Sequence, residues 1–135
     1  MASIKKFTEL LVWQKAHTFV LDIYKTTEKF PASEQFGLTS QLRRAAVSIT
    51  SNIVEGFDRG SPKEFKQFLI VARASLSETQ NQTLIALDLN YISRDRFDAL
   101  AVQSIEIHKM INGLIKSLQT HRLDNSKLKP EVLWH

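Results

Sequence analysis

Hydrophobic residues recur along most of this chain with the period of an α-helix, and the pattern is densest over residues 38–56. At 100° per residue, one sector of that segment is apolar throughout. Its members are Leu38, Leu42, Ala45, Ala46, Ile49 and Ile53. A second sector holds Val47 and Val54, and a third is polar. Because no face resembles a simple solvated surface, we expect this helix to be covered on several sides.

The polar sector carries side chains that need partners outside their own helix. Its members are Gln41, Arg44, Ser48, Ser51, Asn52 and Glu55. Arg44 and Glu55 lie on nearly the same side but about 16 Å apart along the axis, so they cannot pair with each other. We expect these residues, Ser51 excepted, to form buried polar links between helices or subunits together with Glu78, because an unpaired buried charge is costly. Direct contact with a ligand is the alternative, and in a ring assembly the two interpretations merge.

Two further helices flank this segment in the sequence. The first is expected over about residues 8–29, with Thr8 as its N-cap and Pro31 as its stop. The organising helix then ends near Gly56, where glycine is common at a C-cap. The next helix is expected over residues 62–89, because Ser61 can cap it, proline suits its first position and a glutamate can complete a capping box.

The last helix is expected over residues 94–120, after a turn at residues 90–92 and with Ser93 as its cap. Residues 121–135 then form a tail. Three short connections force neighbouring helices to alternate in direction. We therefore predict a single domain, residues 1–135, that is all-α and folds as an antiparallel up-down-up-down four-helix bundle.

Helix 62–89 carries apolar residues on two opposite sides. Besides its main stripe, a second sector contains Ile70, Ala74, Ile85 and Leu89. A monomer would expose this sector, and the second sector of helix 38–56, to water. We therefore expect a homo-oligomer. Helix 94–120 shows only one apolar face, and its outward residues are Glu106, Lys109, Asn112 and Lys116.

Composition excludes several function classes. The 135-residue chain has no cysteine, which excludes a disulfide framework, thiol catalysis and cysteine-ligated metal sites. It shows no secretory signal, and no apolar run approaches the ~20 residues needed to span a bilayer. We expect a cytoplasmic protein without a membrane partner. The net charge of +4 permits attraction to phosphate, although many proteins with no such partner are equally basic.

Familiar catalytic and metal-binding patterns are absent from the sequence. It contains no Gly-rich loop after a strand, no HExxH, no paired Glu-x-x-His and no GxSxG. His17 and His108 have no acidic partner or second ligand at helical spacing, so we interpret both as packing or surface residues. We expect no enzymatic activity, no cofactor and no metal.

A set of basic residues is the candidate contact surface for nucleic acid. Lys66 and Arg73 share a stripe two turns long, and Arg59 and Lys63 extend it toward a loop. Such cations can follow a phosphate backbone, and a symmetric oligomer multiplies a weak site. No aromatic residue is obviously placed to stack exposed bases. The predicted contacts are Arg43, Arg59, Lys63, Lys66 and Arg73; Arg44 is assigned to a structural pair.

Several motifs together resemble a known family. The stretch QLRRAAVSI, followed by NIVEG, occupies residues 41–56. Matching positions elsewhere are Phe7, Leu10, Trp13, Phe30-Pro31, Glu34, Gly37-Leu38, Ser61, Glu64-Phe65, Ala72, Ser75, Leu76 and Glu78. The combination covers about residues 5–120. It is similar to the small four-helix-bundle proteins encoded by intervening sequences in bacterial 23S ribosomal RNA genes.

That resemblance implies a four-helix bundle, a homopentamer and a likeness to the nucleic-acid-binding accessory protein of diversity-generating retroelements. We therefore predict a non-enzymatic, homo-oligomeric bundle that binds RNA or DNA through basic surface charge. The alternative is a purely structural or protein–protein interaction scaffold whose basic charge is incidental.

Overall fold

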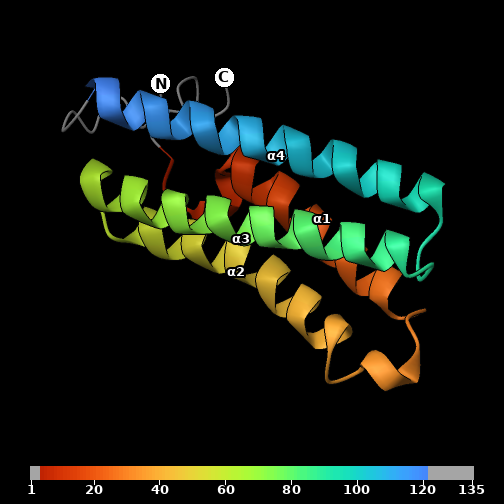
Figure 1. The fold of residues 1–135 in the computed structure, drawn as a ribbon. Coiled ribbons are helices and arrows are strands. Elements are labelled where there is room, and N and C mark those ends of the chain that lie inside the picture. The colour runs from red at the N-terminus through yellow and green to blue at the C-terminus, as the bar shows by residue number, and fades with distance from the viewer. Residues whose placement is uncertain (1–3, 122–135) are drawn as a thin grey trace.

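Four long helices form the part of the protein that the structure, a computed structural model, describes: residues 4–121 (Figure 1). They are α1 (Leu11–Thr27), α2 (Leu38–Asp58), α3 (Pro62–Asp88) and α4 (Arg94–His121). Short 3-10 helices, η1 (Phe7–Glu9) and η2 (Ala32–Glu34), precede α1 and α2. Residues 4–121 contain no strand, so the predicted all-α four-helix fold is confirmed. Except for His121, the predicted tail lies outside the described residues.

The helices are arranged so that each contacts two neighbours along its length. In Figure 1 the chain reverses direction at each of the three connections. α1 and α3 each pack against α2 and α4, and they lie diagonally across the bundle. The most extensive contact is between α2 and α3. The position of α2 therefore depends mainly on α3.

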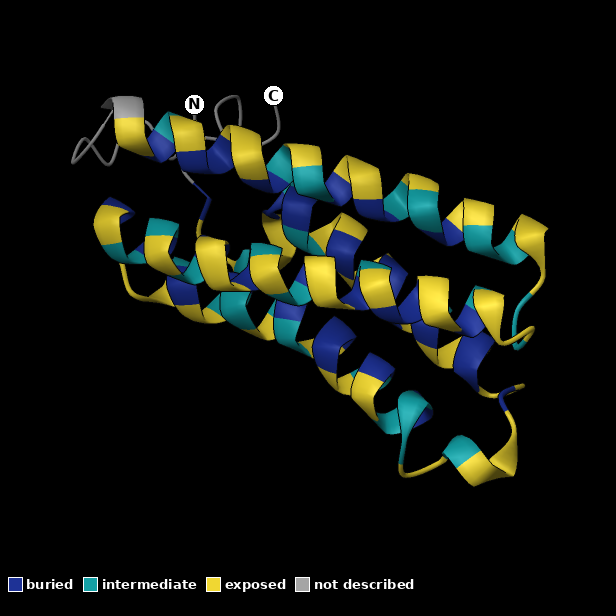
Figure 2. Ribbon diagram, in the orientation of Figure 1, coloured by how far each residue is buried: buried dark blue, intermediate teal, exposed yellow. Residues whose placement is uncertain are grey.

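The apolar stripes of the four helices meet in one core (Figure 2). The main apolar sector of α2 is buried as predicted, except that Leu38 is only partly buried. Complete burial of a Leu, Ile or Phe side chain contributes about 1.5–3 kcal/mol. The largest fully buried side chains are Leu10, Phe19, Ile23, Leu42, Ile49, Ile53, Phe65, Leu69, Leu76, Leu100, Ile107 and Ile111.

The starts of the helices follow the sequence signals in α3 and α4 but not in α1. The hydroxyls of Ser61 and Ser93 each accept a backbone N–H three residues on, at 3.1 Å. α1 begins at Leu11 rather than at Thr8, which lies in η1. Leu10 occupies the N-cap position without a side-chain hydrogen bond and is fully buried. Apolar burial thus fixes this helix start in place of a polar cap.

Gly56 lies inside α2, which continues to Asp58, and so it is not a C-cap. A Cβ atom on Gly56 would lie 2.6 Å from Cβ of Phe68 and 3.1 Å from Cδ1 of Phe65. Carbon atoms do not approach so closely unless one of them moves. Cβ of Phe68 is bonded directly to the backbone of α3, so it cannot move without the helix. The glycine is therefore required for the close approach of α2 to α3.

The outer faces of α3 and α4 expose apolar side chains. The second sector of α3 is exposed, as expected for a single chain, and includes Ile70 and Ile85. α4 departs from the prediction of a single apolar face, because Val102 and Ile105 are 66% and 52% exposed. Val102 and Ile105 are three residues apart, so they lie together on the exposed side of α4.

Glu34 joins two connections at the same end of the bundle. Its Oε1 accepts the backbone N–H of Leu38, the first residue of α2, at 3.0 Å, and its Oε2 accepts the Tyr91 hydroxyl at 2.8 Å. The hydrogen bonds from Leu38 and then from Tyr91 lower the pKa of Glu34. The hydrogen bond to Glu34 raises the pKa of the Tyr91 hydroxyl. The ionised carboxylate thus caps α2 and ties η2 to the α3–α4 connection.

Gly56→Ala should destabilise the fold by about 1–3 kcal/mol, because the added methyl group overpacks the α2–α3 contact. Gly113→Ala is the matched control, since this helical glycine has no atom within 4 Å of an added Cβ. That variant should be stabilised by up to about 1 kcal/mol through helix propensity alone. Thermal or denaturant unfolding measures both; equal shifts in the same direction would contradict the packing role of Gly56.

Tyr91→Phe should raise the pKa of Glu34 toward its ordinary value of about 4.3, as measured by carboxyl NMR titration. Because the folded-state pKa of Glu34 is lowered, its contribution to stability is complete above the unfolded pKa and is lost as pH falls through the folded pKa. The variant should therefore lose less stability on acidification than the parent. Tyr24→Phe is the control and should leave the pKa of Glu34 unchanged; the same result for Tyr91→Phe would disprove the coupling.

Candidate nucleic-acid interface

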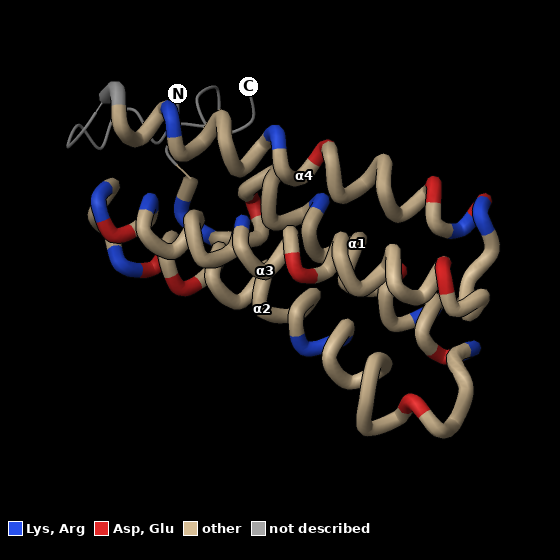
Figure 3. Tube along the Cα trace, viewed as in Figure 1, with Lys and Arg blue, Asp and Glu red and all other residues tan. Residues whose placement is uncertain are grey.

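Lys and Arg lie at both ends of the bundle, but the two halves differ in net charge (Figure 3). Because the helices are antiparallel, the half that contains the α2–α3 connection consists of residues 4–18, 49–74 and 105–121. It carries nine Lys and Arg against five Asp and Glu, a net charge of +4. The other half, residues 19–48 and 75–104, carries six against seven, a net charge of −1. We call the first the basic half, and it is where a polyanion would be attracted.

The register between α3 and α4 is fixed by two hydrogen bonds between side chains. Arg73 Nη1 donates to Asn112 Oδ1 at 2.9 Å, and Gln80 Nε2 donates to Ser104 Oγ at 3.1 Å. The two pairs run in opposite directions along the two helices, as antiparallel packing requires. The first half of α3 consequently lies beside the last half of α4.

This register brings four cations onto one surface. Lys66 lies two turns before Arg73 on the same stripe of α3, and Lys109 and Lys116 share a face of α4 with Asn112, three and four residues away. We call Lys66, Arg73, Lys109 and Lys116 the basic face. The last two were expected only as solvated residues, because helical phase places them outward but does not say which stripe of α3 lies beside them.

The carboxylates nearest in sequence to the basic face form ion pairs elsewhere. Glu106 Oε1 lies 3.2 Å from Lys15 Nζ on α1, and Glu64 Oε2 lies 4.0 Å from Arg59 Nε. Neither of these carboxylates therefore offsets the charge of the basic face through an ion pair with it. Among the lysines of α3 and α4, Lys63, Lys66 and Lys109 form no ion pair or hydrogen bond within the described residues.

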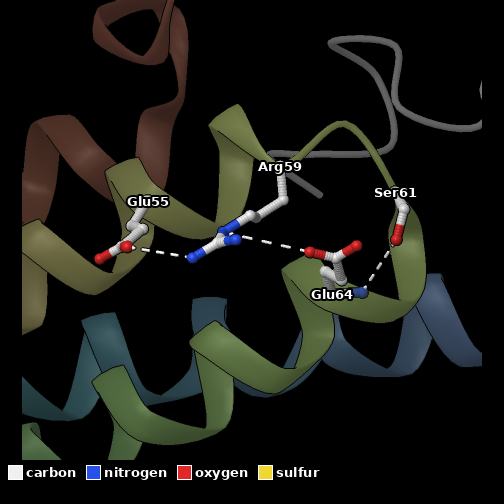
Figure 4. A network of polar contacts seen from close by, with 4 residues as sticks. All are labelled: Glu55, Arg59, Ser61 and Glu64. Atoms are coloured by element: carbon white, nitrogen blue, oxygen red, sulfur yellow. Dashed lines mark hydrogen bonds and ion pairs between the residues drawn. The ribbon is translucent and has the colours of Figure 1, made fainter.

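Arg59, at the end of α2, is held by two carboxylates (Figure 4). Its Nη2 lies 3.2 Å from Glu55 Oε1, and its Nε faces Glu64, whose backbone N–H is bound by the capping Ser61. The guanidinium also lies 5.1 Å from the centroid of the Phe68 ring. All three charged groups are about half exposed, so each pair contributes less than about 1 kcal/mol. Arg59 is thus positioned at the edge of the basic half with much of its charge already offset.

Arg43 is separated from the other predicted contacts and links α1 to α2. Its Nε donates to Thr27 Oγ1 at 2.7 Å, and its Nη2 donates to the carbonyl oxygen of Tyr24 at 3.3 Å. The guanidinium lies 4.6 Å from the centroid of the Tyr24 ring. It lies in the half with a net charge of −1, and two of its nitrogens donate within the fold. We therefore do not include Arg43 in the basic face.

The polar stripe of α2 divides into separate groups. Ser48 Oγ and Ser75 Oγ form a 2.8 Å hydrogen bond between α2 and α3, and Asn52 Nδ2 donates to the carbonyl oxygen of Ser48 at 2.8 Å. The Ser48–Ser75 bond joins the two helices, whereas the Asn52 bond stays within α2. Glu55 instead pairs with Arg59 one turn further on.

A groove of about 360 Å³ continues from the serine pair along α2 and α3. Gln82 Oε1 is buried there and has no hydrogen-bond partner among the described residues. Arg44 and Glu78 line the same groove, are exposed and do not pair with each other. Buried carbonyl groups are normally satisfied, so this surface is short of a donor. The groove is lined by Gln41, Arg44, Ala45, Ser48, Ser75, Glu78 and Gln82.

An aromatic pair lines a second groove, of about 620 Å³, between α1 and α2 in the basic half. The rings of Trp13 and His17 are stacked, with centroids 4.6 Å apart and planes 17° apart, and Phe7 meets Trp13 edge-on at 5.3 Å. Periodicity places Trp13 on the apolar face and His17 at its border, and it does not show that both rings line one groove. The other lining residues are Thr50, Ser51, Val54, Glu55, Asp58 and Arg59.

The described residues contain no cluster suited to a metal ion. Within residues 4–119, no three His, Asp or Glu side chains are grouped so that they would hold one. None of the described helices has the length and apolarity that a membrane span requires.

Comparisons with known proteins place the chain in a family. The sequence model of the 23S rRNA-intervening sequence protein matches residues 8–113. Among solved structures, a protein of unknown function from the S23 ribosomal protein family of Bacteroides thetaiotaomicron VPI-5482 is 25% identical, with a TM-score of 0.73, over 78% of this chain and 96% of that one. Curated proteins gave no significant match. Because the family model spans most of its length, the chain belongs to the 23S rRNA-intervening sequence protein family.

Proposed function

We propose that this protein is a non-enzymatic, homo-oligomeric helical bundle that binds RNA or DNA through phosphate contacts on its basic half. The observation that carries the proposal is the basic face, where four cations gather on α3 and α4 while the carboxylates nearest in sequence pair elsewhere. Phosphate contacts position a strand without reading its sequence. The binding is therefore expected to depend on charge and shape.

The small net charge implies weak binding by one chain. Each phosphate contact releases counterions, and the affinity falls with salt in proportion to the number of contacts. A few lysines on one copy give only a weak site. Several copies in one symmetric assembly present the same face repeatedly, and their combined affinity for one polymer far exceeds that of a single face.

Self-association is supported by the outer surface of α2 and α3. Val47, Ile70 and Ile85 are each about 40% exposed on the surface of the single chain. The neighbouring groove holds the unsatisfied Gln82 oxygen, together with Arg44 and Glu78, which have opposite charges and do not pair with each other. A second copy seated here would cover the apolar residues and supply partners to the polar ones. The proposed number of five copies comes from the family resemblance alone.

The alternative function, a scaffold for protein–protein interaction with incidental basic charge, is favoured by the same exposed apolar surface. Val102 and Ile105 on α4 add apolar area that lies away from the outer face of α3. A scaffold predicts no salt-dependent binding of RNA or DNA. The two functions are therefore separated by a binding measurement at low and high salt.

Replacing Lys63, Lys66 and Lys109 together by Gln should weaken the binding of a single-stranded RNA. The salt dependence of the affinity should become shallower by about 0.7 for each phosphate that is no longer neutralised. These three lysines have no partner within the described residues, so fold and assembly should not change. Fluorescence anisotropy of labelled RNA at several salt concentrations measures both quantities.

The matched control removes three charges from the opposite half through Lys25→Gln, Lys29→Gln and Arg94→Gln. This variant should keep the parental salt slope. If both triple variants bind RNA with equally reduced affinity, net charge alone governs binding, and Lys63, Lys66 and Lys109 are not a specific phosphate site. If the parent binds no RNA or DNA at low salt, the proposed function is wrong.

Ile70→Glu combined with Ile85→Glu should dissociate the assembly, because two carboxylates would be placed in the proposed subunit contact on α3. Val102→Glu combined with Ile105→Glu on α4 is the matched control and should leave the assembly intact. Sedimentation velocity measures the mass of each variant. A parent protein that is a stable 15.5 kDa monomer would contradict self-association.

A further inference from the structure

We infer that the α1–α2 groove beside Trp13 and His17 binds an unpaired nucleobase that carries an exocyclic amino group: cytosine, adenine or guanine. This inference rests on the proposed function, because it requires a nucleic-acid strand at the basic half. It goes further because it adds a base-selective site beside the surface that binds phosphates. The groove volume, about 620 Å³, is ample for one planar base.

The aromatic wall of the groove is suited to stacking. His17 is exposed and stacks on Trp13, and the ring of Phe7 packs edge-on against Trp13. A base that stacks on the open side of this pair extends an existing row of rings. Single-stranded nucleic acids are bound in this way, with unstacked bases placed on aromatic side chains.

The opposite wall offers acceptors to the edge of a base. Asp58 has no ion pair or hydrogen bond within the described residues, and Ser51 has an exposed hydroxyl. Cytosine, adenine and guanine present an exocyclic amino donor that a carboxylate accepts, whereas uracil and thymine have no amino group and carry their one N3–H donor between two carbonyl oxygens that the carboxylate repels. The carboxylates thus disfavour uracil and thymine and make the site selective.

Cations stand on both sides of the groove and can hold the phosphates that flank the base. Lys5 and Lys6 directly precede Phe7, whose ring contacts Trp13, and both lysines are exposed. On the other side, Arg59 lines the groove, and Lys63 follows it in the first turn of α3. A strand that crosses this end of the bundle therefore meets lysines before and after the groove.

Fluorescence of Trp13 provides a direct test. The chain has two tryptophans, so Trp134→Phe leaves Trp13 as the single reporter. In this background, oligocytidylate should quench the fluorescence and bind about tenfold or more tightly than oligouridylate of equal length. His17→Ala should weaken oligocytidylate binding about tenfold. It is preferred to Trp13→Ala because Trp13 also packs against the core.

Asp58→Asn should abolish most of the preference for oligocytidylate over oligouridylate, because an amide also donates to a uracil carbonyl. Asp88→Asn, an exposed aspartate at the far end of α3, is the control and should keep the preference. Unchanged Trp13 fluorescence on oligonucleotide binding, unchanged affinity of the His17→Ala variant for oligocytidylate, or an unchanged preference in the Asp58→Asn variant would each overturn this inference. The basic face would then remain as the site of phosphate contacts. Quenching by spermidine or arginine amide but not by oligocytidylate would assign the groove to organic cations and also overturn it. Failure of every oligonucleotide to bind at low salt would remove the proposed function as well.

Discussion

The close packing of α2 on α3 is the constraint on which the other features depend. Ala45 and Ser48 of α2 lie beside α3, and Gly56 brings the two helices so near that one methyl group would collide with Phe68. The serine pair, Ser48 and Ser75, adds a polar contact that sets the register in the same interface. Once this pair of helices is fixed, the short α2–α3 connection has one place to lie, with Arg59 held between its two carboxylates.

Two different surfaces result at the same end of the bundle. On the α3–α4 side, the Arg73–Asn112 bond places cations of both helices together, and the surface is suited to phosphates of any sequence. On the α1–α2 side, the stacked Trp13 and His17 line a groove with carboxylates, which is suited to a base edge. A strand that passes from one side to the other would be held by charge and selected by stacking. The opposite half contains a groove of about 600 Å³ lined by Lys25, Lys29 and Arg96, but its net charge is −1.

Much of the fold followed from the sequence because it depends on local signals. The periodicity of α2 identified its buried sector, and Ser61 and Ser93 marked two helix starts correctly. The start of α1 was missed because burial of Leu10, which needs the folded core, replaces a polar cap. Gly56 was taken for a helix end because its contact is with residues on another helix.

The site was less predictable because it depends on register between helices. Lys66 and Arg73 share one helix and were placed together correctly, whereas Lys109 joins them only through the packing of α4 on α3. Arg43 looked equally suitable, but its partners Thr27 and Tyr24 lie on α1.

The most direct test of the account is a TROSY NMR titration with a short single-stranded RNA. The account predicts that amide shifts change in residues 4–18 and 59–73 and in the last half of α4, and not around residues 25–29 or 88–98. Changes centred on those latter residues, or spread evenly over the bundle, would contradict it.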